Sequence, residues 1–177
     1  MKATSNHLSF NPKPALSSET LSLRALQLED FDSLYSVVSD PLIWEQHPDK
    51  DRHLLANYQE WFDAAIKDNA LLIVDNISNI AIGSSRYYEI DELKQEVAIG
   101  YTFLARNYWG GATNKELKRL MLEYAFQFFE TVWLHIAEDN MRSRKAAAKI
   151  GATLSHKGEK NGLSYCWYQL KPAAIQA

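Results

Sequence analysis

The chain of 177 residues has little cysteine, little net charge and no long apolar run. Cys166 is its single cysteine, so no disulfide can form within the chain, which fits a reducing cytoplasm. A formal net charge of −3 argues against a nucleic-acid binder, because such proteins are usually basic. Without about 18 consecutive apolar residues or an apolar leader, we expect neither a membrane span nor a signal peptide. These absences predict a cytoplasmic protein that binds neither nucleic acid nor membrane.

The length is sufficient for one domain with a substantial core. Residues 1–18 are polar and contain Pro12 and Pro14, which predicts an N-terminal arm. We expect the domain over residues 19–170 and a short C-terminal tail over residues 171–177. Histidine, cysteine, aspartate and glutamate show no metal-ligand spacing, so we expect no metal site.

Hydrophobic periodicity predicts one α/β domain with a mixed sheet. The expected order is β α α β β β α β α β β. The expected strands are Thr20–Ala25, Leu71–Val74, Ile80–Tyr88, Glu96–Leu104, Val132–Ala137, Thr153–His156 and Ser164–Leu170, and the expected helices are Glu29–Ser39, His53–Lys67, Thr113–Glu130 and Met141–Ile150.

The loop over residues 106–115 carries a glycine pair, Gly110 and Gly111, between a strand and a helix. Thr113 and Glu116 have the spacing of a capping box, with Thr113 as the N-cap. Free backbone N–H groups and the helix dipole make such a helix start attractive to anions, above all phosphates. The loop therefore predicts a phosphate-binding site.

Three cations, Lys115, Lys118 and Arg119, follow in the first two turns of this helix, where the dipole favours acids. A bound polyanion would make these positions favourable. The alternative is a solvated basic face on an ordinary helix.

Two motifs resemble the GNAT N-acetyltransferase family. Asn107-Tyr-Trp-Gly110-Gly-Ala112 is similar to its acetyl-CoA pyrophosphate loop, although Asn107 stands where Gln or Arg is usual. Asn140-x-x-Ser143, followed by Lys149-Ile-Gly151, resembles a motif of the ribosomal-protein alanine N-acetyltransferase branch. The expected order of elements also matches this fold over about residues 19–170.

This resemblance implies a bulged fourth strand that splays from its neighbour, with the pantetheine of acetyl-CoA in the gap. It places the pyrophosphate around the glycine pair and Asn140 against the pantetheine arm. The implied residues that contact acetyl-CoA are Thr102, Phe103, Leu104, Asn107, Trp109, Gly110, Gly111, Ala112, Thr113, Asn114, Asn140, Ser143 and Lys145.

Acetyl transfer needs a neutral amine and a proton for the leaving thiolate. An α-amine, with a pKa of about 7.7–8.0, loses its proton easily, so direct attack requires no covalent intermediate and no role for Cys166. Ser143 is the candidate proton donor, because the tyrosine that many family members carry four residues later is here Ala147. Glu96, at the start of the central strand, where related enzymes often carry a catalytic glutamate, is the leading candidate base. Glu138 and His135 are weaker candidates, and His135 lies in an apolar strand, which is more typical of a core histidine. The alternatives are an ordinary first-turn serine and an exposed strand-end carboxylate.

The acceptor site is expected between the first two helices and the last hairpin. Its candidate residues are Trp44, Glu45, His47 and Tyr88, of which the first three belong to a polar-aromatic segment that suits a substrate loop better than a core. The expected function is acetyl-CoA-dependent N-acetylation of a protein N-terminus or a small amine, by a monomer or homodimer. The alternative is a non-catalytic acyl-CoA-binding or interaction module.

Overall fold

The structure, a computed structural model, describes residues 9–172, and its elements follow the expected order with one additional short strand at the start. Residues 1–8 of the expected arm and 173–177 of the expected tail lie outside the described residues. Among the residues described, no helix is long and apolar enough to cross a membrane. The strands are β1 (Leu16–Ser17), β2 (Leu21–Ala25), β3 (Leu71–Asp75), β4 (Ile80–Asp91), β5 (Glu96–Leu104), β6 (Thr131–Ala137), β7 (Thr153–Lys160) and β8 (Leu163–Leu170). The helices are α1 (Phe31–Val38), α2 (Leu55–Lys67), α3 (Thr113–Ala125) and α4 (Met141–Lys149), with short 3-10 turns at Leu28–Asp30, Pro41–Ile43, Lys50–His53 and Arg106–Tyr108.

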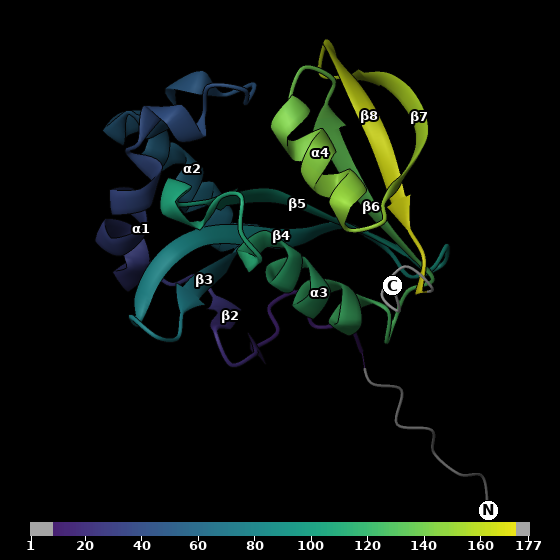
Figure 1. The fold of residues 1–177 in the computed structure, drawn as a ribbon, viewed down its shortest axis with the longest axis horizontal. Coiled ribbons are helices and arrows are strands. Elements are labelled where there is room, and N and C mark those ends of the chain that lie inside the picture. Colours follow the sequence, from purple (N-terminus) through teal and green to yellow (C-terminus); the bar gives the residue numbers. More distant parts are fainter. Residues whose placement is uncertain (1–8, 173–177) are drawn as a thin grey trace, which may run out of the picture.

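The strands form one mixed sheet in the order β1-β2-β3-β4-β5-β6-β8-β7, in which only β5 and β6 run parallel. This confirms the predicted α/β fold. Two buried clusters cover the sheet: Leu117 of α3 and Ala147 of α4 belong to one, and Leu34 of α1 and Phe62 of α2 to the other. Figure 1 shows α1 and α2 grouped on one side of the molecule, apart from α4, β7 and β8.

Helix α3 differs from its prediction at both ends. The predicted capping box is wrong, because Ala112 is the N-cap and no side chain caps the helix. Glu116 instead accepts hydrogen bonds from Ser18 Oγ (2.5 Å) and Thr20 Oγ1 (2.6 Å), which lie between β1 and β2. The helix also ends at Ala125 rather than at residue 130, since the chain there turns to start β6 beside β5.

Strand β5 contains the predicted bulge. Ser84 of β4 is opposite Phe103 of β5, but Arg86 is opposite Gly100, so β5 has one extra residue between these pairs. Tyr101 lies within this bulge and has a φ of 53°, in the left-handed region that non-glycine residues rarely adopt. Strand β5 then pairs with β6 only over Glu96–Ala98. Beyond that point the two strands diverge, which confirms the predicted splay.

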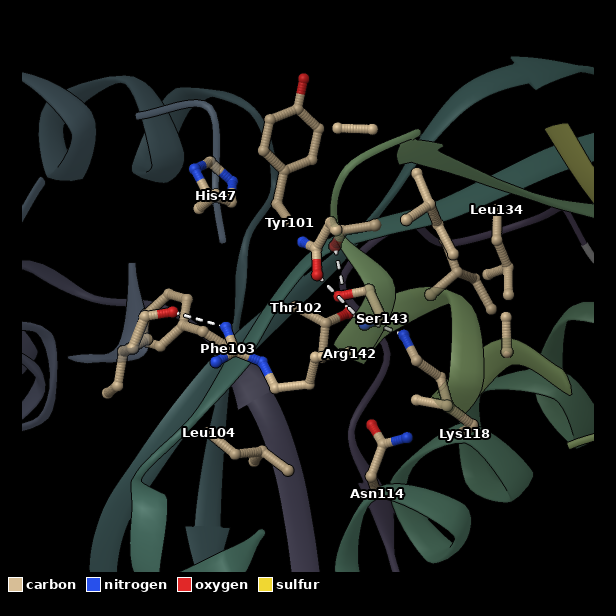
Figure 2. A pocket seen from close by; sticks show the side chains of 18 of the residues that line it. His47, Tyr101, Thr102, Phe103, Leu104, Asn114, Lys118, Leu134, Arg142 and Ser143 are labelled. Atoms are coloured by element: carbon tan, nitrogen blue, oxygen red, sulfur yellow. Dashed lines mark hydrogen bonds between the residues drawn. The ribbon is translucent and has the colours of Figure 1, made fainter. Parts of the chain in front are cut away.

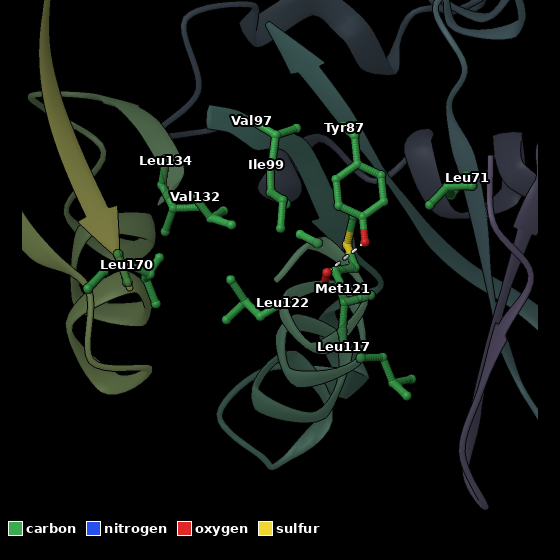
Figure 3. Close-up of a cluster of buried hydrophobic side chains, with 14 of the residues drawn as sticks. Leu71, Tyr87, Val97, Ile99, Leu117, Met121, Leu122, Val132, Leu134 and Leu170 are labelled. Atoms are coloured by element: carbon green, nitrogen blue, oxygen red, sulfur yellow. Dashed lines mark hydrogen bonds between the residues drawn. The ribbon is translucent and has the colours of Figure 1, made fainter. Parts of the chain in front are cut away.

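Packing against α3 fixes the central strands. Tyr87 of β4 is buried, and its hydroxyl donates a 2.7 Å hydrogen bond to the carbonyl of Met121 in α3 (Figure 3). Val97 and Ile99 of β5 lie in the same buried cluster (Figure 3). Because the helix and both strands share this cluster, the loop that precedes α3 is held at the end of β5.

Replacement of Gly83 tests how closely β4 and β5 approach. A Cβ at this position would lie 2.1 Å from the Phe103 carbonyl oxygen, so we expect Gly83→Ala to lower the free energy of unfolding by about 3 kcal/mol. Gly111→Ala is the matched control: its Cβ would meet no atom within 4 Å, and a change within about 0.5 kcal/mol is expected. Urea denaturation measures both. Wild-type stability of Gly83→Ala would contradict the close approach.

Candidate active site

A cavity of about 280 Å³ opens where β5 and β6 diverge. Its walls come from β5 beyond Ala98, from β6, from the loop before α3, from α4, and from the segment between α1 and α2. Figure 2 shows His47 and Tyr101 toward one end, and Asn114 and Lys118 toward the other. We call the first the outer end and the second the loop end. The cavity therefore joins elements that are far apart in the sequence.

The loop before α3 is held by its aromatic residues. Trp109 Nε1 donates to the Leu104 carbonyl (2.9 Å), and the Tyr108 hydroxyl donates to Asp75 at the end of β3 (2.6 Å). Gly110 has a φ of 75° and open space beside it. Because no side chain caps α3, the free N–H groups of its first turn lack a side-chain acceptor. A capping box would occupy some of these N–H groups, so a helix start without one is better able to bind an anion.

Helix α4 brings Asn140 and Ser143 to the opposite wall of the cavity. Asn140 is buried and caps the helix: its side chain accepts a 3.1 Å hydrogen bond from the Ser143 backbone N–H. Gly151, with a φ of 82°, follows the end of the helix. The Ser143 hydroxyl lines the cavity, and no residue within 9–172 hydrogen-bonds to it. Its proton is therefore available to a group in the cavity.

Lys118 is the one member of the predicted basic trio that lines the cavity. Its side chain is buried, and Nζ donates to Thr102 Oγ1 (2.7 Å), which lies 2.7 Å from Ser85 Oγ. Burial lowers the pKa of its ammonium to about 7. Lys115 lies outside the cavity, and Arg119 pairs with Glu123 on the helix surface (2.7 Å). Arg119 therefore belongs to a solvated basic face of the helix, whereas Lys118 is buried in the cavity wall.

The segment after α1, predicted as a substrate loop, is core at Trp44 and borders the cavity at His47. Trp44 is 1% exposed, and its Nε1 donates to the Val38 carbonyl (2.8 Å), although its ring borders the cavity. His47 lines the outer end, and burial together with the nearby Arg52 lowers its pKa to about 4. Its Nδ1 accepts from the Asp49 backbone N–H (2.9 Å), so the neutral ring presents Nε2–H as a donor.

Sequence reasoning missed Arg142. Its guanidinium lies 4.1 Å from the centre of the Trp109 ring and donates to the Ile43 carbonyl (2.6 Å), so it joins α4 to the loop and to the segment after α1. The cation stands in the first turn of α4, where the helix dipole disfavours it. A cation in an early helical turn is also the feature that marks Lys118 in the sequence, so the same reasoning identifies Arg142.

Several predicted residues lie outside this cavity. Glu96 lines a separate hollow with Trp133, and Glu45 and Lys145 are exposed away from the cavity. Tyr88 packs against Gly100, where a Cβ would come within 2.7 Å of its ring. The loop residues Asn107, Gly111, Ala112 and Thr113 do not line it either, although they adjoin Gly110, which does. The cavity does contain the following predicted residues: Trp44, His47, Thr102, Phe103, Leu104, Trp109, Gly110, Asn114, Asn140 and Ser143.

Two further observations concern the cysteine and possible metal ligands. Cys166 is buried in β8 and does not line the cavity. Among residues 9–172 there is no group of three or more histidine, cysteine, aspartate or glutamate side chains arranged to hold a metal ion.

The fold is similar to solved acetyltransferases. A GCN5-related N-acetyltransferase from Brucella melitensis has a TM-score of 0.82 at 18% identity, covering 94% of this chain and 86% of that one. Spermidine N-acetyltransferase from Vibrio cholerae, solved with CoA and spermine, has a TM-score of 0.69 at 17% identity, covering 90% and 100%. Ribosomal-protein-S5-alanine acetyltransferase from Vibrio fischeri has a TM-score of 0.68 at 13% identity, covering 89% and 96%.

Because all three sequence identities are low, these likenesses establish the fold alone. The sequence itself matches the acetyltransferase (GNAT) domain family over residues 20–153, which is most of the chain. Together with the bulged β5, the divergent β6 and the glycine loop before α3, this match means that the chain belongs to the GNAT acetyltransferase domain family.

Proposed function

We propose that this protein is an acetyl-CoA-dependent N-acetyltransferase in which a primary amine attacks the acetyl group directly. The observation that carries the proposal is the cavity at the divergence of β5 and β6, with the unpaired Ser143 hydroxyl on its wall. Amine acetylation with acetyl-CoA is the general reaction of the family to which the chain belongs.

The residues present fit acetyl-CoA. Three features suit its phosphates and its pantetheine: the open space at Gly110, the uncapped start of α3, and the edge of β5 that lacks a strand partner beyond Ala98. Asn140 and the backbone from Thr102 to Leu104 would hold the pantetheine arm, and Lys118 would attract the anionic part of CoA. Acetyl-CoA supplies the activated acetyl group when it is bound.

Ser143 handles the proton that the leaving sulfur needs. As the nitrogen–carbon bond forms and the carbon–sulfur bond breaks, Ser143 Oγ–H donates a hydrogen bond to the departing sulfur and passes its proton to it, while Oγ takes a replacement proton from solvent in the cavity. The position of the more usual tyrosine is Ala147, which is buried and carries no proton. Cys166, outside the cavity, takes no part.

The proton of the amine leaves through His135 rather than Glu96. His135 lines both the cavity and the hollow that contains Glu96, and its Nδ1 lies 3.0 Å from the Tyr88 hydroxyl. Burial holds its pKa below the usual value, so the ring is neutral near pH 7 and able to accept a proton. In this proposal Tyr88 positions His135 and does not contact the acceptor.

Ser143→Ala tests the proton donor. We expect kcat to fall roughly 10²-fold, with the affinity for CoA unchanged, because the hydroxyl acts on the leaving sulfur. Steady-state CoA release with an amine panel measures kcat, and calorimetry measures CoA binding. Ser33→Ala is the matched control, since Ser33 occupies the same helical position in α1 and donates to the Asp30 carbonyl instead.

The same assay separates the enzyme from an acyl-CoA-binding module. Tight CoA binding with no acetylation of any amine, and no difference between the Ser143 and Ser33 variants, would overturn the enzymatic function. The panel contains N-terminal peptides as well as small amines, because the sequence resembles the alanine N-acetyltransferase branch and the Vibrio fischeri neighbour is described as acting on a ribosomal protein.

Lys118→Met tests the buried cation in the wall. Below its pKa of about 7, Lys118 is charged and attracts an anionic ligand; above it, the charge is lost. We therefore expect the variant to bind CoA about tenfold more weakly than wild type at pH 6, but with a clearly smaller deficit at pH 8.5. Lys67→Met removes an exposed lysine of α2 and is the control. The ionisation of CoA itself between the two pH values affects this variant and Lys118→Met alike. Equal losses at both pH values would contradict a titrating Lys118.

A further inference from the structure

The wall of the cavity carries basic side chains and no acidic one. His47, Arg52, Lys118, His135 and Arg142 line it, and no aspartate or glutamate of residues 9–172 does. A site for a polyamine needs carboxylates, because each ammonium must be paired when it leaves water. The cavity therefore does not suit a polycation, although a structural neighbour was crystallised with spermine.

The phosphates of CoA do not account for all of these groups. Lys118 and Arg142 lie toward the glycine loop, since Lys118 belongs to α3 and Arg142 stacks on Trp109. Arg52 belongs instead to the outer end, in the 3-10 turn between α1 and α2. It lies close enough to His47 and Tyr101 to interact with them electrostatically. A cation there faces the second substrate.

Arg52 is held rigidly. It is 7% exposed, and its guanidinium lies 4.9 Å from the ring centre of Trp44 and 5.5 Å from that of Trp61. One terminal nitrogen pairs with Asp49, whose side chain is 62% exposed to solvent. The other N–H groups have no hydrogen-bond partner within residues 9–172 and remain free to donate. With His47 Nε2–H, they form a cluster of donors without an acceptor.

One acid contacts this cluster. Asp49, outside the cavity, pairs with Arg52 and offsets part of its charge. The unpaired N–H donors of Arg52 and His47, rather than a net positive charge, therefore favour an anionic oxygen. Glu45 is exposed outside the cavity. Glu89 lies 3.6 Å from His135 Nδ1 and binds Lys160 (2.6 Å), again outside the cavity. Donors in a partly buried site bind an anionic oxygen most strongly, and a guanidinium fork matches a carboxylate.

We propose that the acceptor of this enzyme is a primary amine that carries a carboxylate close to the amino group, and that Arg52 and His47 bind that carboxylate. The inference rests on the proposed function and narrows its substrate class. A free amino acid and a peptide with an acidic N-terminal residue both present this chemistry, and the test separates them.

The experiment measures kcat/KM with acetyl-CoA for matched acceptors. The panel is L-aspartate, a neutral L-amino acid and its amide, an acidic and an uncharged tripeptide, and spermidine. The α-amino group of the amino-acid amide is less basic than that of the free amino acid, so a larger fraction of it is neutral near pH 7. This difference by itself would make the amide the more reactive acceptor. We expect the free acid to exceed its amide at least tenfold, against this bias, and spermidine to be the poorest acceptor. The two tripeptides, compared with L-aspartate, show which source of the carboxylate is used.

Two variants connect the preference to the residues. We expect Arg52→Met, which keeps the length of the side chain, to lower kcat/KM at least tenfold for the carboxylate acceptors and little for the amide. His47→Gln, a milder change, should reduce the same preference several-fold. Lys94→Gln removes one positive charge at an exposed site outside the cavity and should leave the preference intact. Thermal melting monitors folding of each variant.

The outcomes separate the two proposals. Acetylation of spermidine or of the amide as well as of the carboxylate acceptors would overturn this inference and leave the proposed function standing. An equal loss on all acceptors in both folded variants would do the same. No acetylation of any amine would overturn the proposed function, and this inference with it.

Discussion

The structure depends on one irregularity, the bulge at Tyr101 in β5. The pairing of β5 with β6 covers three positions and ends at Ala98, the bulge follows between Gly100 and Phe103, and the cavity occupies the gap between the two strands. The neighbours of Tyr101 support its unusual backbone: the Arg86 guanidinium lies 3.5 Å from the centre of its ring, and Tyr88 packs edge-on against it. A regular β5 would close the sheet and remove the site, so the sheet gives up hydrogen bonds to form a binding surface.

Much of this could be predicted from sequence because the signals are local. Alternation and helical spacing identify the elements, Asn140 identifies a helix start, and the glycine pair identifies the loop. The ends of α3 were mispredicted because tertiary contacts decide them: Glu116 binds two side chains almost a hundred residues away instead of capping its own helix. Periodicity within one segment contains no information about such partners.

The same limit explains the site. Glu96 lies on the predicted strand, but at its paired end, three residues before the strands part. The sequence predicts Trp44 and Tyr88 as lining residues of the acceptor site. The packing shows that Trp44 is a core residue whose ring borders the cavity, and that Tyr88 packs against Gly100 outside it. Arg142 and Lys118 were accessible to sequence reasoning, since each is a cation in an early helical turn that the dipole disfavours.

The uncapped start of α3 has a thermodynamic meaning. A side-chain cap is worth about 1 kcal/mol to a helix, and this helix does without one because Ala112 stands at its N-cap. Glu116 lies in the first turn, where the dipole favours an acid, and its carboxylate accepts hydrogen bonds from Ser18 and Thr20, so it also anchors the segment between β1 and β2. An anion that accepts from the uncapped N–H groups would supply the missing cap, so its binding would stabilise α3, and through Glu116 the segment between β1 and β2, against unfolding.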